Sequence, residues 1–412
     1  MKKIKIILKI AVFLAVYVGG QALVKYALVD DTNTISRIML HDLYTEEKNI
    51  DILFCGASHC QLGFNTEVTD EVFRMNTFNA GSSSQGLETS LALIKEAEAY
   101  HDLKQVYVDL DYSIVMREEP NLESIYIISD YMKPSFRKVS YLLNATSFDY
   151  YLNSFMPLHK GRGYTKNPKK VLEILQKKST AGYRDYTDRD PSYAGKGHIA
   201  SRTVVEEGTL WSGEGYVSRK FEIPYEQQNY LKQIISFCKK EGIELTFVSV
   251  PVTDFHLALL GNYDEYVIAV REFLAEYDVE YYDFNLCRQE ILPLTSDSYF
   301  NDDNHLNQDG SRRFDCVFAD FFCGIIEEDE LFWDSYAEKL ANSEPRVLGL
   351  IVQKSTSGED MANSGLQVIP VLNRKDIRAV CNVEHQNEVY VITAALNGVE
   401  TNRVEIRDEE LR

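Results

Sequence analysis

The sequence has too few basic residues for a typical nucleic-acid-binding protein. It holds 43 lysines and arginines against 63 aspartates and glutamates, a formal net charge of −20 at pH 7. A negative field of this size opposes association with the phosphate backbone of DNA or RNA. We therefore expect no nucleic-acid partner. An anionic substrate would need a local basic patch such as the run His159 to Lys170, which suits a solvated loop better.

Cysteines are also few, and their spacing is irregular. An odd number without a short regular spacing argues against a disulfide framework, even in an exported protein. The separation of Cys316 and Cys323 fits no zinc knuckle. We expect buried free thiols at the seven positions, which are Cys55, Cys60, Cys238, Cys287, Cys316, Cys323 and Cys381.

Tandem repeats and low-complexity tracts are absent, but a long uncharged run lies near the N-terminus. Lysines precede the run Ile10 to Val24, an order that predicts export of the rest of the chain. Snorkelling of Lys9 and Lys25 would extend the apolar segment to Ile6 through Val29, long enough to span a membrane. We expect residues 1–29 to be a membrane anchor with the main domain extracytoplasmic. A signal cleaved near Gly20 to Ala22 would give a secreted protein instead.

Strand and helix patterns alternate through most of the chain. Buried strands are predicted at Ile50–Gly56, Lys104–Asp111, Ile243–Pro251 and Val279–Phe284, and an amphipathic helix at Gly86–Tyr100. Such alternation is typical of an α/β fold, a parallel sheet flanked by helices. We assign residues 30–343 to this domain.

Two segments depart from the alternation. Residues from about 114 to 224 lack clean periodicity, and a stretch this long predicts an insertion with its own helices that packs over a site. Its tyrosines suit either sugar stacking or packing within the insertion. Residues 344–412 contain short strand-like runs separated by turn signals, which predict a small β-rich C-terminal module.

A candidate nucleophile follows the first predicted strand. The stretch ILFCGASHCQLGFN runs a buried strand into Gly-Ala-Ser-His, which places Ser58 at the edge of the sheet. Downstream, Asp302 precedes His305 by three residues, so that its carboxylate can accept from Nδ1 of the imidazole. The other ring nitrogen is then free to take a proton from a serine. The serine follows the first strand and the histidine lies beyond the last, so both can meet at the carboxyl edge of the sheet.

Three further residues are candidates for the oxyanion or the substrate. Gly81 falls where a second strand would end, and its amide could join that of Ser58 in an oxyanion hole, or it could form an ordinary turn. Gln85 lies on the same loop and could donate through its side chain. His59 adjoins the serine, and adjacent side chains on a tight turn usually point apart. We interpret it as a packing or substrate-contact residue and not as the base.

Metal chemistry is a weaker alternative at this site. Asp302, Asp303 and His305 could hold an ion, but a triad explains the same residues and also uses the serine. We therefore expect no metal and no cofactor.

Together these motifs resemble those of the SGNH/GDSL-type hydrolases, which have a flavodoxin-like three-layer fold. Ser58 in GASHCQLGFN, Gly81 in NAGSSSQ and Asp302/His305 in DDNHLNQDG look like the first, second and fifth blocks of that superfamily. The membrane-anchored extracytoplasmic branch, with the D-alanyl-teichoic-acid transfer and alginate-type O-acetylation proteins, is the most similar. The resemblance covers about residues 50–113 and 225–323.

The resemblance implies a serine esterase or acyltransferase that acts on a cell-envelope glycopolymer and receives acyl groups from a membrane-bound acyl-transfer protein. Ser58 would be the nucleophile, His305 the base and Asp302 its orienter. One element departs from the family. Its third block supplies an asparagine after a strand, whereas the matching stretch VYVDLDYS offers Asp109 and Asp111, and a carboxylate would repel an oxyanion. A degenerate site in a non-catalytic envelope protein that binds polymer is therefore the alternative.

Overall fold

The centre of the protein is a parallel sheet, seen here in a computed structural model. The structure describes residues 2–32, 34–155, 167–206, 208–217, 221–294, 296–355 and 365–411. The sheet has five strands in the order β2-β1-β3-β7-β8, the flavodoxin-like order. The strands are β1 (Ile52–Cys55), β2 (Thr77–Asn79), β3 (Gln105–Asp109), β7 (Glu244–Ser249) and β8 (Glu280–Asp283). The predicted α/β class is confirmed, and each predicted strand of this sheet is present.

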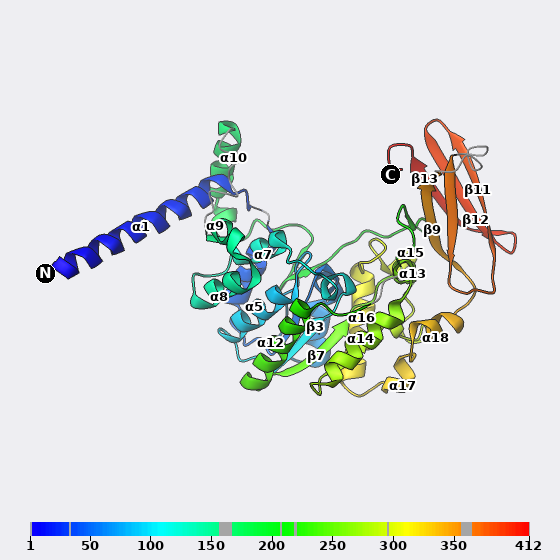
Figure 1. Ribbon diagram of the computed structural model, residues 1–412, viewed down its shortest axis with the longest axis horizontal. Helices are drawn as coiled ribbons and strands as arrows, with labels where there is room; N and C mark the ends of the chain where they lie inside the picture. The colour runs from blue at the N-terminus through cyan, green and yellow to red at the C-terminus, as the bar shows by residue number, and fades with distance from the viewer. Residues whose placement is uncertain are drawn as a thin grey trace.

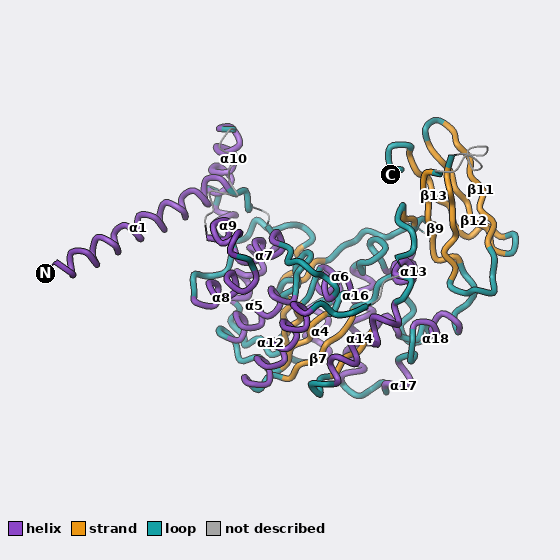
Figure 2. The backbone as a smooth tube through the Cα atoms, in the orientation of Figure 1, coloured by secondary structure: helices purple, strands orange, loops and turns teal. Residues whose placement is uncertain are grey.

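Helices cover both faces of the sheet (Figures 1 and 2). On one face α16 packs its Phe318 against Phe54 of β1 and Tyr107 of β3, which are paired across the two strands. On the other face α5 contacts β1, and α12 contacts both α5 and β7. The helices of this core are α3 (Ser58–Gly63), α4 (Thr66–Phe73), α5 (Leu87–Glu98), α6 (Tyr112–Val115), α12 (Tyr225–Glu241), α13 (Asp254–Leu260), α14 (Tyr263–Ala275), α15 (Ser296–Tyr299), α16 (Gln308–Phe322), α17 (Glu328–Leu331) and α18 (Tyr336–Ala341).

The segment between β3 and α12 holds several helices and short strands. Its α8 packs on α5, whereas a later stretch that includes β5 reaches α3 and the loop before α16. The later stretch therefore lies beside the region predicted to be a site, as does the beginning of the segment around Tyr112 and Met116. The run His159 to Lys170 falls largely outside the described residues. The elements are α7 (Leu122–Ser129), α8 (Phe136–Ala145), α9 (Tyr151–Phe155), α10 (Pro168–Lys178), α11 (Ala181–Arg184), β4 (Tyr193–Gly195), β5 (His198–Ile199) and β6 (Trp211–Ser212).

The C-terminal residues form a β-rich module, as predicted. Two three-stranded sheets, β10-β9-β6 and β11-β12-β13, share an apolar core that includes Leu350, Ile392 and Ile406. One strand of the module, β6, comes from the insertion and pairs in parallel with β9, which the sequence did not indicate. The strands are β9 (Val347–Lys354), β10 (Leu366–Leu372), β11 (Ala379–Gln386), β12 (Val389–Leu396) and β13 (Val399–Arg407). The exact domain boundaries stay predictions.

The module packs closely on the α/β domain through β9. Gly349 lies against the ring of Phe255 on α13, where a Cβ atom would come within 2.5 Å of the ring. Nearby, Asp254 accepts from Lys339 Nζ at 2.9 Å and also pairs with Arg346. The contact is therefore both apolar and ionic.

The N-terminal helix α1 (Lys2–Leu28) stands out from the rest of the molecule (Figure 1). Its segment Lys3–Leu28 is 26 residues long and apolar enough to cross a membrane, and the same features fit a signal sequence. The base of the helix is held by the insertion, where buried Lys178 pairs with Asp31 at 2.7 Å. Helix α2 (Ile35–Thr45) then leads into the sheet.

All seven cysteines are free thiols. Those at positions 55, 60, 238 and 287 are buried, as predicted. The prediction of burial is wrong for Cys316 and Cys323, which are exposed on or next to α16, because these positions lie on the outer side of that helix, and Cys381 on β11 is only half-buried.

Candidate active site

Ser58 lies just beyond the carboxyl end of β1, at the start of the short helix α3. The strand is fully buried, so the chain must turn at Gly56 to leave the sheet. A side chain at Gly56 is excluded, because a Cβ atom there would lie 2.6 Å from the Cβ of Asp109 on the neighbouring strand. This tight turn holds Ser58 at the edge of the sheet.

His305 and Asp302 lie on the loop that leads into α16. The carboxylate of Asp302 accepts from the backbone N–H of Asn304 at 3.0 Å and from that of His305 at 2.8 Å. It also accepts from Nδ1 of His305 at 2.9 Å. One carboxylate therefore shapes the loop and orients the ring. The loop then closes at Asn307, whose side chain caps the first N–H groups of α16.

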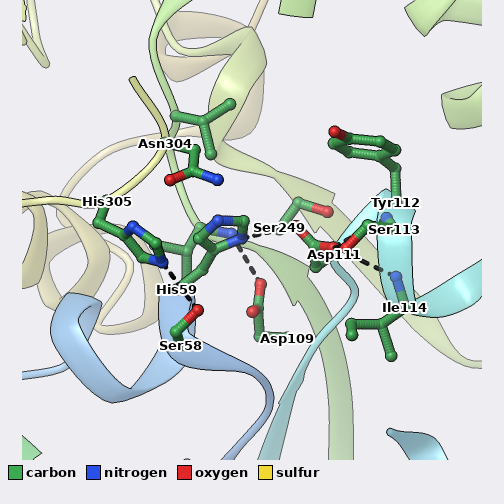
Figure 3. A network of polar contacts seen from close by, with 12 residues as sticks. Ser58, His59, Asp109, Asp111, Tyr112, Ser113, Ile114, Ser249, Asn304 and His305 are labelled. Atoms are coloured by element: carbon green, nitrogen blue, oxygen red, sulfur yellow. Dashed lines mark hydrogen bonds and ion pairs between the residues drawn. The ribbon is translucent and has the colours of Figure 1, made fainter. Parts of the chain in front are cut away.

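The structure brings these three side chains into one hydrogen-bonded chain, of which Figure 3 shows the contact between Ser58 and His305. Nε2 of His305 lies 2.7 Å from Oγ of Ser58, within the range expected of a nucleophile and its base. Burial raises the pKa of Asp302, but the hydrogen bond and charge of His305 outweigh this, and the pKa is lowered. Asp302 is thus an anion at neutral pH, able to hold Nδ1 in its protonated form.

Gly81 lies where predicted, after β2, but its amide is already used. It donates to Oδ1 of Asn79 at 2.9 Å, and the Asn79 side chain in turn donates to the carbonyl of Cys60 at 2.8 Å. A Cβ atom at Gly81 would lie 2.7 Å from the backbone nitrogen of Gln61 on α3. In this conformation Gly81 lets the β2 loop approach the nucleophile helix and leaves its amide unavailable for an oxyanion.

We expect Gly81→Ala to destabilise the protein by about 1–3 kcal/mol, because the added methyl group meets backbone atoms that cannot rotate away. Thermal unfolding would measure the loss. Gly213→Ala is the matched control, since the nearest atom there is 3.8 Å away. A normal unfolding temperature combined with lost activity would instead favour a direct role of the Gly81 amide.

Gln85 does not offer a free side-chain amide either. Its Oε1 accepts from Oγ of Ser82 at 2.7 Å, and its Nε2 donates to Oγ of Ser90 at 3.1 Å. Both ends of the buried side chain are therefore occupied within its own loop and α5. The role in the oxyanion hole that the sequence suggested for Gln85 is not supported by these contacts.

The side chain of His59 leaves the backbone in another direction from that of Ser58, as expected of adjacent residues. Its ring nevertheless lies at the site. Its Nδ1 lies 2.6 Å from Oδ2 of Asp111, and its ring centroid lies 5.0 Å from that of His305. Burial lowers the pKa of His59, but the charge and hydrogen bond of Asp111 more than compensate and raise it to about 9. His59 is therefore a cation at neutral pH.

The two aspartates at the end of β3 and just after it, Asp109 and Asp111, have different environments. Burial raises the pKa of Asp109 to about 7, so that its carboxyl group is partly protonated near neutral pH. Its Oδ1 accepts from the N–H of Val250 at 3.0 Å, whereas Oδ2 is buried without a hydrogen-bond partner among the described residues. Burial also acts on Asp111, but the charge of His59 prevails and lowers its pKa. The charge of Asp111 is thus balanced by His59.

A second hydrogen-bonded chain lies beside the first. The hydroxyl of Tyr112 is 2.9 Å from Nε2 of His256, and Nδ1 of His256 is 2.9 Å from Oδ2 of Asp303. These side chains line a cavity of about 310 Å³, which also borders Met116 and Phe221. Tyr112 directly follows Asp111 in the sequence, and Asp303 directly follows Asp302. The cavity therefore adjoins the site that contains Ser58.

The sequence analysis did not predict Asp111 as the partner of His59, nor the second series of hydrogen bonds from Tyr112 through His256 to Asp303. One signal in the sequence indicates the pair of His59 and Asp111. Strands β1 and β3 pair in parallel with Cys55 opposite Val108. Ser58 lies three residues after Cys55 and Asp111 three residues after Val108, so this register brings Asp111 beside Ser58 and the adjacent His59. The pair His256 and Asp303 has no such signal, since its members come from α13 and a distant loop.

Comparisons with known proteins add little to this geometry. No family model matches the chain, and no curated protein matches it. A solved structure described as "a putative platelet activating factor from Streptococcus pneumonia" aligns with 74% of this chain and 98% of its own at 11% identity. The TM-score of 0.34 is too low for an argument about activity.

Proposed function

We propose that the protein is an extracytoplasmic serine acyl-ester hydrolase or O-acyltransferase of the cell envelope, tethered to the membrane by α1. The observation that carries the proposal is the chain from Ser58 Oγ through His305 to Asp302, with distances of 2.7 and 2.9 Å. A hydroxyl, an imidazole and a carboxylate in this order are the parts needed for nucleophilic acyl transfer.

The reaction follows from the positions of these atoms. Ser58 Oγ attacks the ester carbonyl carbon while its proton passes to Nε2 of His305, and the carbonyl electrons move onto oxygen. The oxyanion collapses, the leaving alcohol takes the proton from His305, and the acyl group remains on Ser58. A water or an acceptor hydroxyl then repeats the steps in reverse. The backbone N–H of Ser58 is one donor to the oxyanion.

Transfer to a polymer is favoured over simple hydrolysis by the position of the domain. Helix α1 would hold the site at a membrane, where a membrane-bound acyl-transfer protein could deliver the acyl group. The sequence resemblance points to a glycopolymer of the envelope, a polysaccharide or a teichoic-acid-like chain, as the acceptor. Both acetyl and D-alanyl groups fit this chemistry.

The cavity beside the triad is the candidate acceptor site. It combines aromatic rings with polar groups, a lining that suits the faces and hydroxyls of a sugar. We expect Met116→Trp, which fills the cavity, to raise the KM for the acceptor about tenfold or more without slowing acylation of Ser58. Met116→Leu, of similar volume, is the control. An unchanged acceptor KM in the Trp variant would place the acceptor elsewhere.

The function is tested by following acyl groups in the full-length, detergent-solubilised protein. Acetyl and D-alanyl esters are supplied as donors and envelope glycan fragments as acceptors, and acylated glycan is measured by mass spectrometry. Acylated glycan that depends on Ser58 supports transfer, and release of free acid alone supports hydrolysis. Glycan binding without any turnover would favour the non-catalytic alternative.

A further inference from the structure

The proposed site lacks one donor that its chemistry needs. An oxyanion is best stabilised by several N–H groups aimed at it. The Gly81 amide is bonded to Asn79, and the end of β3 and the loop after it carry the carboxyl groups of Asp109 and Asp111 in place of a carboxamide. The N–H of Ser58 alone would be a weak oxyanion hole. Another group near Ser58 must then supply the missing positive charge.

His59 directly follows Ser58 in the sequence, and its ring lies beside that of the base, His305. Its ring lies between Asp111 on one side and His305 on the other (Figure 3). The ring centroids of the two histidines are 5.0 Å apart, and Nε2 of His305 is 2.7 Å from Ser58 Oγ. His59 is therefore close to the reacting atoms although its side chain leaves the backbone in another direction from that of Ser58.

The orientation of the His59 ring leaves one N–H free for a substrate. The two nitrogens of an imidazole are separated by one carbon and their N–H bonds point in different directions, and both are donors when the ring is protonated. Nδ1 is held by Asp111 at 2.6 Å. Nε2 has no hydrogen-bond partner among the described residues, and it is not one of their fully buried unpartnered polar atoms, so this nitrogen of the 8% exposed side chain keeps access to solvent. An N–H of a cation that lies beside the nucleophile and still reaches solvent is available to a bound substrate.

We propose that His59, oriented by Asp111, donates its Nε2–H to the oxyanion that forms when Ser58 attacks an ester. This inference rests on the proposed acyl-transfer function and adds a catalytic residue to it, with Asp111 as the positioning residue. The proton of Ser58 still passes to His305, and His59 keeps both of its protons throughout. The His59–Asp111 pair thus takes the place of the absent carboxamide, and the charge of Asp111 is not left to repel the oxyanion.

A charged donor of this kind acts mainly on the transition state. The substrate carbonyl is neutral and becomes an anion only on attack, so loss of the donor should lower kcat far more than it changes KM. The donor must also remain protonated. Asp111, Asp109 and Asp302 are the carboxyl groups that face His59 and raise its pKa to about 9, with burial acting in the opposite direction. Activity should therefore decline as pH rises through about 9.

The ion pair of His59 and Asp111 also determines whether stability rises or falls with pH. The pKa of His59 is raised in the folded protein from 6.5 to about 9. A group of this kind contributes stability that is fully present below its unfolded pKa and is lost as pH rises through the folded value. The wild type should therefore lose stability between about pH 6.5 and 9 relative to His59→Gln.

The test compares wild type, His59→Gln and Asp111→Asn in the full-length protein. His101→Gln, at the opposite end of β3, is the control. The rates of p-nitrophenyl acetate cleavage and of labelling by a fluorophosphonate probe are measured from pH 6 to 10. Negative charge builds on the phosphoryl oxygen while Ser58 displaces fluoride from the probe, as it does on the carbonyl oxygen of an ester, so both rates report on the donor.

We expect His59→Gln to lower kcat and the labelling rate about 100-fold, with KM changed less than threefold, and to abolish the decline near pH 9. Asp111→Asn should move that decline to lower pH, because the carboxylate no longer holds the proton on His59. Normal rates in a folded His59→Gln variant, or a loss of rate with the decline unchanged, would overturn the inference. A wild type that is never labelled would instead refute the proposed function itself.

Discussion

Replacing Ser58 by alanine should abolish ester turnover, with kcat for p-nitrophenyl acetate reduced by about 10³-fold or more. The hydroxyl lies 2.7 Å from Nε2 of His305, and no other side chain of the described residues shares that nitrogen. Without the hydroxyl the acyl group has no covalent carrier, and only slow attack by water assisted by His305 remains. The protein should fold normally, since alanine at the start of α3 removes a single oxygen.

Rates are measured by release of p-nitrophenolate from the full-length protein, with far-ultraviolet circular dichroism to check the fold. Ser83→Ala is the matched control, because this serine is exposed on the nearby loop after β2. It should retain the wild-type rate. Turnover that survives in folded Ser58→Ala would show that another group carries the reaction.

Replacing Asp302 by asparagine should lower kcat by about 10³- to 10⁴-fold while leaving the loop largely intact. The asparagine oxygen can still accept from the backbone N–H groups of Asn304 and His305, which lie within 3.0 Å of the carboxylate. An amide group can turn its own N–H toward Nδ1, and the ring would then carry its proton on Nε2. In that tautomer His305 cannot accept the proton of Ser58.

The measurement is kcat at neutral pH together with imidazole proton resonances, which report the tautomer of His305. Asp309→Asn provides the control, since this exposed carboxylate lies in the first turn of α16. A rate near that of the wild type in Asp302→Asn would mean that another group orients the base. A low rate with the Nδ1-protonated ring still present would also contradict the account.

Local patterns predicted the sheet well, because each of its strands carries its own signal. The run Ile52–Cys55 is buried on both faces and therefore reads as continuous apolar sequence. The helix around Leu231 and Ile234 shows the spacing of a half-buried helix, and Gly242 ends it with φ of 75°. The strand β6 gave no such signal, since it is two residues long and exists only through pairing with β9.

The contacts of the site likewise divide into those that a local sequence pattern predicts and those that depend on the folded arrangement. Asp302 and His305 are three residues apart, so their contact is a property of one turn and could be read from the sequence. The role of Gly81 depends on how closely its loop approaches α3, which no local pattern records. The ion pair of His59 and Asp111 needs the register of two strands, and His256 with Asp303 needs the whole fold.

These contacts change how the two aspartates at the end of β3 and just after it affect an oxyanion. In the sequence, Asp109 and Asp111 indicate two negative charges where an oxyanion must form. In the structure Asp111 is neutralised by His59, and burial brings the pKa of Asp109 to about 7. The site is therefore less negative than its sequence suggests, which supports an active enzyme over a degenerate one.

The most direct test of the central claim is to map where a fluorophosphonate probe reacts with the full-length protein, by peptide mass spectrometry, in wild type and in His305→Ala. We expect a single adduct on Ser58 in the wild type and none in the folded His305→Ala variant. An adduct on a different residue, or equal labelling of Ser58 without His305, would contradict the claim.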